Sequence, residues 1–287
     1  MTTRETGLLP PLAGDRPARP DEVDEFATQG HALVRGIASA EEIASYRPVI
    51  RDAAERHNRE TRPLEERETY GKAFLQVPNL WTVDEGVKAF TLAARFARVA
   101  AELLQVEGVR LYHDQALFKE SGGGKTPWHQ DQFYWPIDGP YTITMWMPLV
   151  DVTFESGSMS FASGTHLRGH LEELAISDES DARYEKMVET EGLRVCNYGS
   201  MSAGDATFHA GWCLHAAPPN VTDAMREVMT VIYFSDGVRA AEPRNVNQRS
   251  DLAGWMPGVE PGDLAASPLN PLLWPMRTLR EDGPDAE

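Results

Sequence analysis

The chain has 287 residues, of which 41% are hydrophobic and 9% aromatic, and this is the composition of a globular protein long enough to bury one large core. Its formal charge of −17, with no cluster of Lys and Arg, argues against nucleic acid or an anionic membrane as a partner. No apolar run approaches the roughly 18 residues of a membrane span, and the start lacks a secretory signal, so we expect a cytoplasmic protein. Cys196 and Cys213 are too few for a disulfide framework, so we expect reduced thiols.

The distribution of apolar residues indicates one domain between two short extensions. Residues 1–20 contain four prolines and no periodic apolar pattern, which is typical of a flexible lead-in. No large apolar residue follows Leu279, so we expect 278–287 to be a flexible tail. The domain between them, 21–277, is predicted to have helical cover at about 39–104, a β core at about 109–235, an inserted segment at 171–191 and a packed C-terminal extension at 236–277.

Two helices are predicted ahead of the β core. Ser39 and Glu42 form a capping-box pattern, and the apolar spacing after them predicts a helix over 40–58 that Pro48 kinks or splits. A second amphipathic stretch runs from about 86 to 104 and carries one apolar stripe. Both stretches are suited to covering a sheet.

From Val109 onward the apolar period changes to two, which predicts strands. In the segment 141–149 one face is apolar, and the other face, with Thr142, Thr144 and Trp146, is too mixed for a dry core and suits the lumen of a barrel that holds a polar ligand. Further strands are expected at 111–119, 159–162, 204–209 and 226–234. Without alternating strands and helices, the fold class is mainly β, antiparallel, with flanking helices.

The inserted segment 171–191 contains eight acidic residues and few large apolar ones. Two interpretations stay open for it. It is either a solvated excursion from the β core or a mobile lid over the pocket.

The most informative motif is His129-Gln-Asp131. An imidazole and a carboxylate at i and i+2 of an extended segment project to the same side and can hold one metal ion, although the pair alone is a weak signal. Downstream, His209 and His215 lie at the end of a strand pattern and offer a third ligand. Two His and one carboxylate form the facial triad of non-haem Fe(II) oxygenases. Arg226 opens the next strand and can pair with the distal carboxylate of 2-oxoglutarate.

The ordered set of motifs resembles the phytanoyl-CoA dioxygenase family of Fe(II)/2-oxoglutarate-dependent oxygenases over roughly 22–235. It comprises His129-Gln-Asp131, Gly204-Asp-x-x-x-Phe-His, His215, the Pro-Asn220 turn, Arg226, Trp146-Met-Pro-Leu-Val-Asp151 and Glu155-Ser-Gly with Gly164-Thr-His166. The resemblance implies a double-stranded β-helix (jelly-roll, cupin-like) core. It implies His129, Asp131 and His215 as iron ligands, in preference to His209, and Arg226 as the cosubstrate anchor.

The same resemblance suggests further contacts with the cosubstrate. Trp146 matches an aromatic residue that borders it, Gln115 lies where family members often contact it, and Lys72 resembles a lysine that reaches the same site. Where the family often has Ser two residues after the distal histidine, this chain has Ala217. The missing hydrogen bond leaves more of the binding to Arg226 and to Thr144.

The residues around the motif have two possible roles. Phe133, Trp135 and Trp128 either pack in the core or form a platform for substrate. Cys213 precedes a candidate ligand by two residues, but a thiolate would suit zinc or copper better, so we interpret it as a buried structural cysteine.

The resemblance therefore predicts a dioxygenase that uses Fe(II), 2-oxoglutarate and O2 to hydroxylate a C–H bond of a small-molecule substrate, releasing succinate and CO2. Asp131 disfavours halogenation, because related halogenases replace this carboxylate with a small residue. Desaturation, epimerisation or ring closure at the same site stay open. So do a zinc-type metal hydrolase and a non-catalytic ligand-binding β-barrel, whereas the substrate and the oligomeric state are not indicated.

Overall fold

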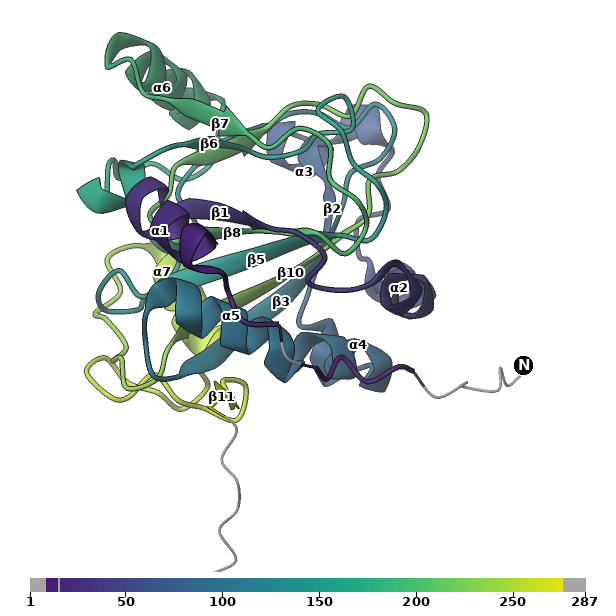
Figure 1. The fold of residues 1–287 in the computed structure, drawn as a ribbon. Helices are drawn as coiled ribbons and strands as arrows, with labels where there is room; N and C mark the ends of the chain where they lie inside the picture. The colour runs from purple at the N-terminus through teal and green to yellow at the C-terminus, as the bar shows by residue number, and fades with distance from the viewer. Residues whose placement is uncertain (1–8, 15, 276–287) are drawn as a thin grey trace, which may run out of the picture.

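A computed structural model describes residues 9–14 and 16–275, and these form two antiparallel sheets that face each other with helices outside (Figure 1). The larger sheet has the order β1-β8-β5-β10-β3-β11, with β2 also pairing with β3, and the smaller has the order β4-β9-β6-β7. Two facing antiparallel sheets with crossing connections form a double-stranded β-helix, so the predicted fold class is confirmed.

The strands lie at the positions that the period-two pattern indicated, together with several short ones. The larger sheet contains β1 (His31–Val34), β2 (Leu75–Pro78), β3 (Val109–Phe118), β5 (Thr142–Pro148), β8 (Ala206–Ala210), β10 (Val228–Ser235) and β11 (Leu272–Trp274). The smaller sheet contains β4 (Thr126–His129), β6 (Ser160–Ala162), β7 (Val195–Asn197) and β9 (His215–Ala217). The long strands β3, β5 and β10 form the centre of the larger sheet.

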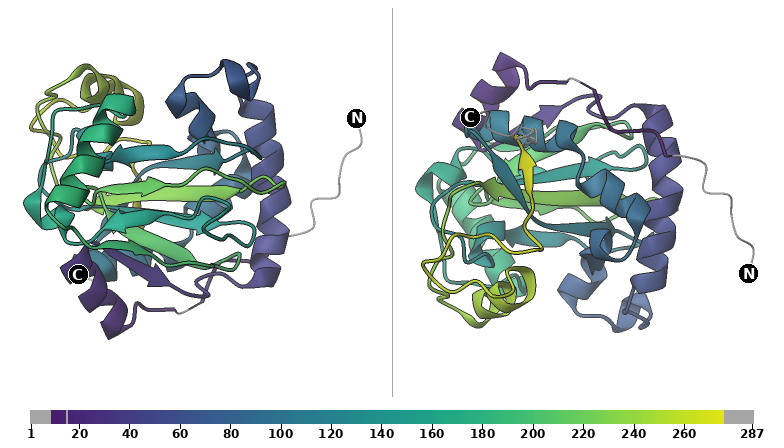
Figure 2. Two further views of the ribbon diagram at one scale, coloured as in Figure 1. Left: turned by 90° about the horizontal axis from the view of Figure 1, so that it is seen from above. Right: turned by 90° about the horizontal axis from the view of Figure 1, so that it is seen from below.

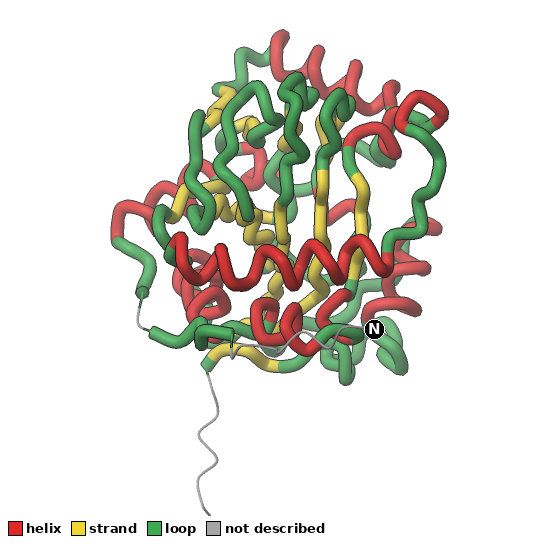
Figure 3. The backbone as a smooth tube through the Cα atoms, turned by 90° about the vertical axis from the view of Figure 1, so that its right-hand side faces the viewer, coloured by secondary structure: helices red, strands yellow, loops and turns green. Residues whose placement is uncertain are grey.

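Most helices cover the outer face of the larger sheet or the two ends of its strands, and α6 packs against the smaller sheet (Figure 1). They are α1 (Pro20–Gln29), α2 (Ala40–His57), α3 (Thr69–Ala73), α4 (Glu85–Thr91), α5 (Ala94–Leu104), α6 (Asp178–Thr190) and α7 (Val246–Trp255), with short 3₁₀ turns η1 (Leu64–Glu66), η2 (Leu80–Thr82), η3 (Asp131–Phe133) and η4 (Thr165–Arg168). Figures 2 and 3 show α2 lying across one end of the central strands, and Figures 1 and 2 place α7 at the other end.

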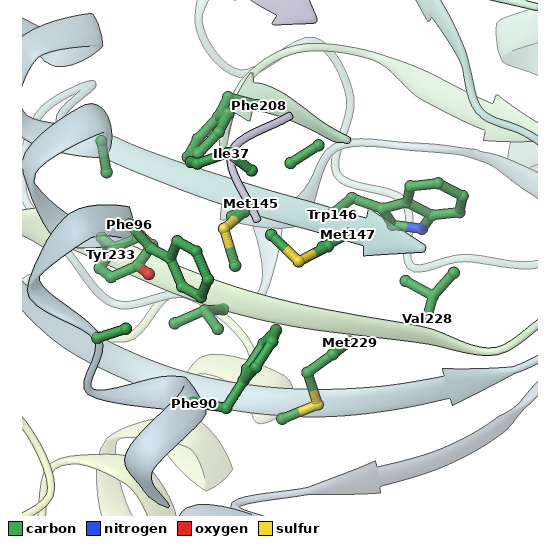
Figure 4. Close-up of a cluster of buried hydrophobic side chains, with 14 of the residues drawn as sticks. Ile37, Phe90, Phe96, Met145, Trp146, Met147, Phe208, Val228, Met229 and Tyr233 are labelled. Carbon is green, nitrogen blue, oxygen red and sulfur yellow. The ribbon is translucent and has the colours of Figure 1, made fainter. Parts of the chain in front are cut away.

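The core lies between the larger sheet and the helices α4 and α5. Figure 4 shows Met145 and Met147 of β5 beside Phe90 of α4 and Phe96 of α5, and all four side chains are fully buried. The alternate residues Thr144 and Trp146 point to the other face of the sheet and line a cavity. The two faces predicted for this strand are therefore observed, because side chains of a strand alternate between its faces.

Of the two outcomes predicted for Pro48, a kink or a split, the structure excludes the split, and the second predicted helix is divided in two. Pro48 does not split its helix: α2 runs through it from 40 to 57, because Pro48 and the residue one turn before it are exposed, where water can satisfy the freed carbonyl. The stretch 86–104 is two helices, α4 and α5. The chain turns between them, and the hydroxyl of Thr91 donates to the buried Asp114 at 2.9 Å at the end of α4.

The terminal and inserted segments are ordered where the structure describes them. In the lead-in, Leu12 is buried and the carbonyl of Pro10 accepts a hydrogen bond from Tyr46 at 2.9 Å. Residues 1–8, 15 and 276–287 lie outside the described residues, and with them most of the predicted tail. The segment 171–191 contains α6, whose capping residue Ser177 accepts from the backbone of Ser180 at 3.1 Å. No described helix is long and apolar enough to cross a membrane.

Candidate active site

Two paired strands of the smaller sheet bring the predicted histidines together. His129 is the last residue of β4, His215 is the first of β9, and the two are directly opposite in the strand register. Their ring centroids are 4.1 Å apart. Asp131 follows in η3, and one ligand atom from each of the three residues lies within 4.8 Å of the others. Residues more than 80 positions apart thus form one cluster because β4 and β9 are neighbours.

The backbone fixes which nitrogen each histidine presents. Nδ1 of His129 lies 2.8 Å from the carbonyl of Pro127, and Nδ1 of His215 lies 2.9 Å from the carbonyl of Cys213. A carbonyl can only accept, so both Nδ1 atoms carry hydrogen, and Nε2 is the nitrogen that each histidine can offer to a metal. Burial and the neighbouring His129 hold the pKa of His215 well below its usual value. His215 is therefore neutral, as a metal ligand must be.

The carboxylate of Asp131 is held so that its two oxygens have different surroundings. Oδ1 faces Nε2 of His129 at 3.4 Å and Nε2 of His215 at 3.6 Å. Oδ2 accepts a hydrogen bond from the hydroxyl of Thr144 at 3.1 Å and lies 3.1 Å from Nε2 of His209. Although burial by itself would raise the pKa of Asp131, the surrounding imidazoles hold it well below its usual range. Oδ1 is thus an ionised ligand atom that points at the two histidines.

His209, the alternative to His215 as third ligand, lies on the other side of the Asp131 carboxylate from His129 and His215. Its Nε2 reaches Oδ2, whereas the two other histidines reach Oδ1. Its Nδ1 is buried with no hydrogen-bond partner among the described residues. Hydrogen bonds of this kind orient a ligand and raise its basicity. The geometry favours His209 as the residue that orients Asp131.

Arg226 reaches the same cavity from the start of β10. The residue is 2% exposed, and its guanidinium donates to the carbonyl of Gly157 at 2.8 Å, while Nε has no partner among the described residues. Gly157 has a φ of +91°, and a Cβ there would lie 3.1 Å from the side chain of Lys119, so glycine suits this close turn. The Cζ atom of Arg226 lies 5.2 Å from the centre of the Trp146 ring. The cation therefore lies over the face of the Trp146 ring.

The charge of Arg226 is not balanced by an acidic residue. No carboxylate within the described ranges forms an ion pair with it, and burial lowers its pKa to about 9. A buried cation without a counterion is unfavourable unless a ligand supplies the negative charge. The donor set of two imidazoles and a carboxylate fits ferrous iron, and Arg226 fits the carboxylate of a bound acid. The residues present therefore fit both groups that the sequence predicts.

A cavity of about 390 Å³ connects these groups. It is lined by the predicted residues His129, Asp131, His215, Arg226, Trp146, Gln115, Thr144 and Trp135. Three other predicted residues, Lys72, Phe133 and Trp128, are not among its lining residues. Phe133 is buried and stacks at 6.2 Å with His170, and Trp128 packs with Tyr184 and Leu214 under α6. Closeness in sequence to His129 therefore does not predict which side chains line the cavity, because the chain turns through η3 just after this residue.

Several lining residues were not predicted. Gln76 of β2 donates to the side chain of Gln115, and Tyr70 donates to Gln76 at 3.0 Å. Asp251 and Trp255 come from α7, in a part of the sequence where no motif indicated a site. Ala217, by contrast, lines the cavity, as its place two residues after His215 implied. The only sequence signal for the α7 residues is the presence of an aromatic residue in a polar helix.

Solved structures show where this fold recurs. The non-heme alpha ketoglutarate dependent carbocyclase SnoK from nogalamycin biosynthesis matches with a TM-score of 0.73 and 22% identity over 90% of this chain and 99% of that chain. The epimerase SnoN, in complex with Fe3+, alpha ketoglutarate and nogalamycin RO, matches with a TM-score of 0.71 and 24% identity over 88% and 97%. EctD from S. alaskensis, with 2-oxoglutarate and 5-hydroxyectoine, matches with a TM-score of 0.64 and 17% identity over 84% and 86%. At these identities the likeness shows the fold.

The amino-acid sequence itself identifies the family. The model of the phytanoyl-CoA dioxygenase family matches residues 26–228, which is most of the chain and contains every metal and anchor residue described above. The matched segment ends in β10, so α7 and β11 lie beyond it. The chain therefore belongs to the phytanoyl-CoA dioxygenase family.

Proposed function

We propose that the protein is an Fe(II)- and 2-oxoglutarate-dependent dioxygenase whose metal ligands are His129, Asp131 and His215. One observation carries the proposal: three ligand atoms converge beside a buried Arg226 that has no counterion among the described residues. The two features are complementary, since a 2-oxo acid can chelate a metal at one end and pair with a guanidinium at the other. Neither feature would be needed by a barrel that only binds an apolar ligand.

When bound, iron with 2-oxoglutarate and O2 supplies the oxidising power to attack a C–H bond, and succinate and CO2 are released. The protein's own residues position the reactants. Nδ1–H donation to backbone carbonyls holds both histidines in place, and Thr144 and His209 fix the carboxylate. Trp146 and Arg226 bind the far end of the cosubstrate, while the apolar wall around them excludes water.

The substrate occupies the part of the cavity away from Arg226. Along β10, Thr230 pairs with Gln115 and Trp146, and Ile232 pairs with His113 and Thr144. The cavity therefore runs from Arg226, past the metal ligands, to the wall at Ile232. We propose hydroxylation of a small molecule as the reaction, with desaturation, or the epimerisation and ring closure named for SnoN and SnoK, as outcomes of the same site. The carboxylate at Asp131 disfavours halogenation.

The ligand assignment is tested by two matched variants. In air with Fe(II), 2-oxoglutarate and a pool of candidate substrates, we expect the wild type to form succinate and His215→Ala to form none. His209→Ala should keep metal binding, measured by anaerobic Fe(II) titration, with about 10- to 100-fold weaker affinity, because it loses only an orienting hydrogen bond. If His209→Ala abolishes Fe(II) binding and His215→Ala does not, the assignment is wrong. Turnover that is independent of O2 would favour a zinc-type hydrolase.

A further inference from the structure

One half-buried carboxylate in the cavity plays no part in the proposed chemistry. Asp251 lines the cavity from α7 and accepts a hydrogen bond from the hydroxyl of Tyr112 at 2.9 Å. No Lys, Arg or His nitrogen forms an ion pair with it in the part of the chain that the structure describes. Burial raises the pKa of Asp251 to about 6, offset in part by hydrogen bonds from Tyr112 and Trp255. At neutral pH the carboxylate is largely ionised and lacks a counterion.

An irregularity in the pairing of β3 with β10 brings Tyr112 next to Asp251. The pairing of β3 with β10 shifts between Ile232 and Tyr233, so that Ile232 faces His113, Tyr233 faces Leu111, and Tyr112 is the extra residue. A β-bulge of this kind re-aims a side chain and is common beside active sites. Tyr112 packs with Ile232 and Trp135, two residues that line the cavity, and His113 next to it lines the cavity itself.

Aromatic rings surround the carboxylate. The ring of Tyr112 lies 5.5 Å from Trp135 and 4.9 Å from His113, and His113 lies 5.2 Å from Trp255. Trp135, Tyr134, Trp255 and His113 all line the cavity. His113 carries no charge here, since burial lowers its pKa to about 4. Indole and phenol faces attract cations, and a carboxylate among them accepts hydrogen bonds from an ammonium group.

Asp251 and Arg226 lie toward opposite ends of the cavity, and this position suits Asp251 to binding substrate. Arg226 precedes β10 near α2, where Arg47 pairs with Glu227 at 2.6 Å, whereas α7 lies at the opposite end of the strands (Figures 1 and 2). The metal ligands lie between them, because Thr144, which holds Asp131, pairs with Ile232. In addition, α7 lies outside the segment that the family model matches.

We propose that Asp251, held by Tyr112 and flanked by Trp135 and Trp255, binds a protonated amine of the substrate, so that the substrate is a small cationic amine held on the far side of the metal from Arg226. The proposal rests on the proposed function and names the substrate class of the same site. The aromatic rings bind the apolar part next to the nitrogen, and Asp251 supplies the counterion.

The test uses benzylamine and its neutral counterpart benzyl alcohol as probes. Each is titrated at pH 7.5 into anaerobic protein loaded with Fe(II) and saturating 2-oxoglutarate, which occupies Arg226, and binding is followed by tryptophan fluorescence and calorimetry. We expect benzylamine to bind at least tenfold more tightly than benzyl alcohol. Equal affinities of the two probes for the wild-type protein would overturn the proposal, whatever the variants do.

Asp251→Asn should reduce the preference for benzylamine to less than threefold, whereas Asp138→Asn, which removes the same charge from an exposed residue outside the cavity, should keep it. A preference that persists in Asp251→Asn would overturn the proposal. Circular dichroism and the 2-oxoglutarate charge-transfer band check that the variant is folded. If the charge-transfer band forms and the wild type binds both probes equally, the amine subsite is rejected and the proposed function stands. If the wild type shows no band, the proposed function itself is rejected.

Discussion

Replacing Arg226 with Met is expected to weaken cosubstrate binding without destabilising the protein that has no ligand. The side chain is 2% exposed and lacks an acidic partner among the described residues, and it donates to the carbonyl of Gly157. Loss of one partner from a buried, hydrogen-bonded charge pair costs about 2–5 kcal/mol, so 2-oxoglutarate should bind roughly 30- to 5,000-fold more weakly to Arg226→Met.

The same change should have the opposite effect on the protein without ligand. It removes a desolvated cation and replaces it with an apolar chain of similar length, so the melting temperature of the unliganded protein should stay the same or rise. Arg226→Lys should bind 2-oxoglutarate more weakly than the wild type, because an ammonium group cannot match the two carboxylate oxygens at once.

The assay is thermal unfolding with and without 2-oxoglutarate, together with calorimetric titration in the presence of Mn(II) as a redox-stable metal. Arg35→Met is the matched control, since Arg35 pairs with Asp205 at 2.8 Å and does not line the cavity. The reasoning would be refuted if Arg226→Met bound 2-oxoglutarate within threefold of the wild type, or if Arg35→Met weakened it as much.

Three further predictions test other parts of the site and the core. Ala217→Ser should restore a hydroxyl on the cavity wall and tighten 2-oxoglutarate binding by about 2- to 10-fold in calorimetry, as one hydrogen bond contributes about 0.5–1.5 kcal/mol; unchanged affinity would show that the cosubstrate lies elsewhere. Thr144→Val removes the hydrogen bond to Oδ2 of Asp131 and should weaken Fe(II) affinity by about 10- to 100-fold, which anaerobic titration measures. His31 is buried against Tyr198 and Ser163, and burial lowers its pKa from 6.5 to about 3. Between these values only the unfolded chain takes up this proton, so the unfolding free energy should fall as the pH drops from 6.5 towards 3, by up to about 1.4 kcal/mol per pH unit for this group. Urea unfolding should show a shallower acid slope in His31→Gln, and parallel slopes would contradict the assignment.

The sequence predicts the long elements of the fold well, because their periodicity extends over enough residues to be seen. The central strands β3, β5 and β10 and the helix α2 lie within two residues of their predicted bounds. The family and the enzyme class, a 2-oxoglutarate-dependent dioxygenase, are confirmed by the match over residues 26–228. Short strands such as β4, with Pro127 inside it, have too few residues for a period to emerge, yet β4 and β9 carry the two histidines.

The inserted segment and the far wall of the cavity were harder to predict. The acidic segment 171–191 lacks a broad apolar stripe, yet α6 forms on its Ser177 cap and buries Tyr184. The amide of Ile176 donates to the hydroxyl of Tyr134 at 2.8 Å, and Ile176 lines the cavity, so a lid stays a prediction for this segment. The sequence does not indicate Asp251, because its helix α7 has no apolar stripe, and only the fold shows which of its residues face inward.

The central claim is that one cavity holds iron and 2-oxoglutarate together, and anaerobic optical titration tests it most directly. Addition of Fe(II) and then 2-oxoglutarate to the wild-type protein should produce a visible metal-to-ligand charge-transfer band that saturates at one equivalent of each. His215→Ala should not form the band, and Arg226→Met should form it only at much higher 2-oxoglutarate concentration. A wild-type protein that binds Fe(II) and 2-oxoglutarate without the band, or binds neither, would contradict the account.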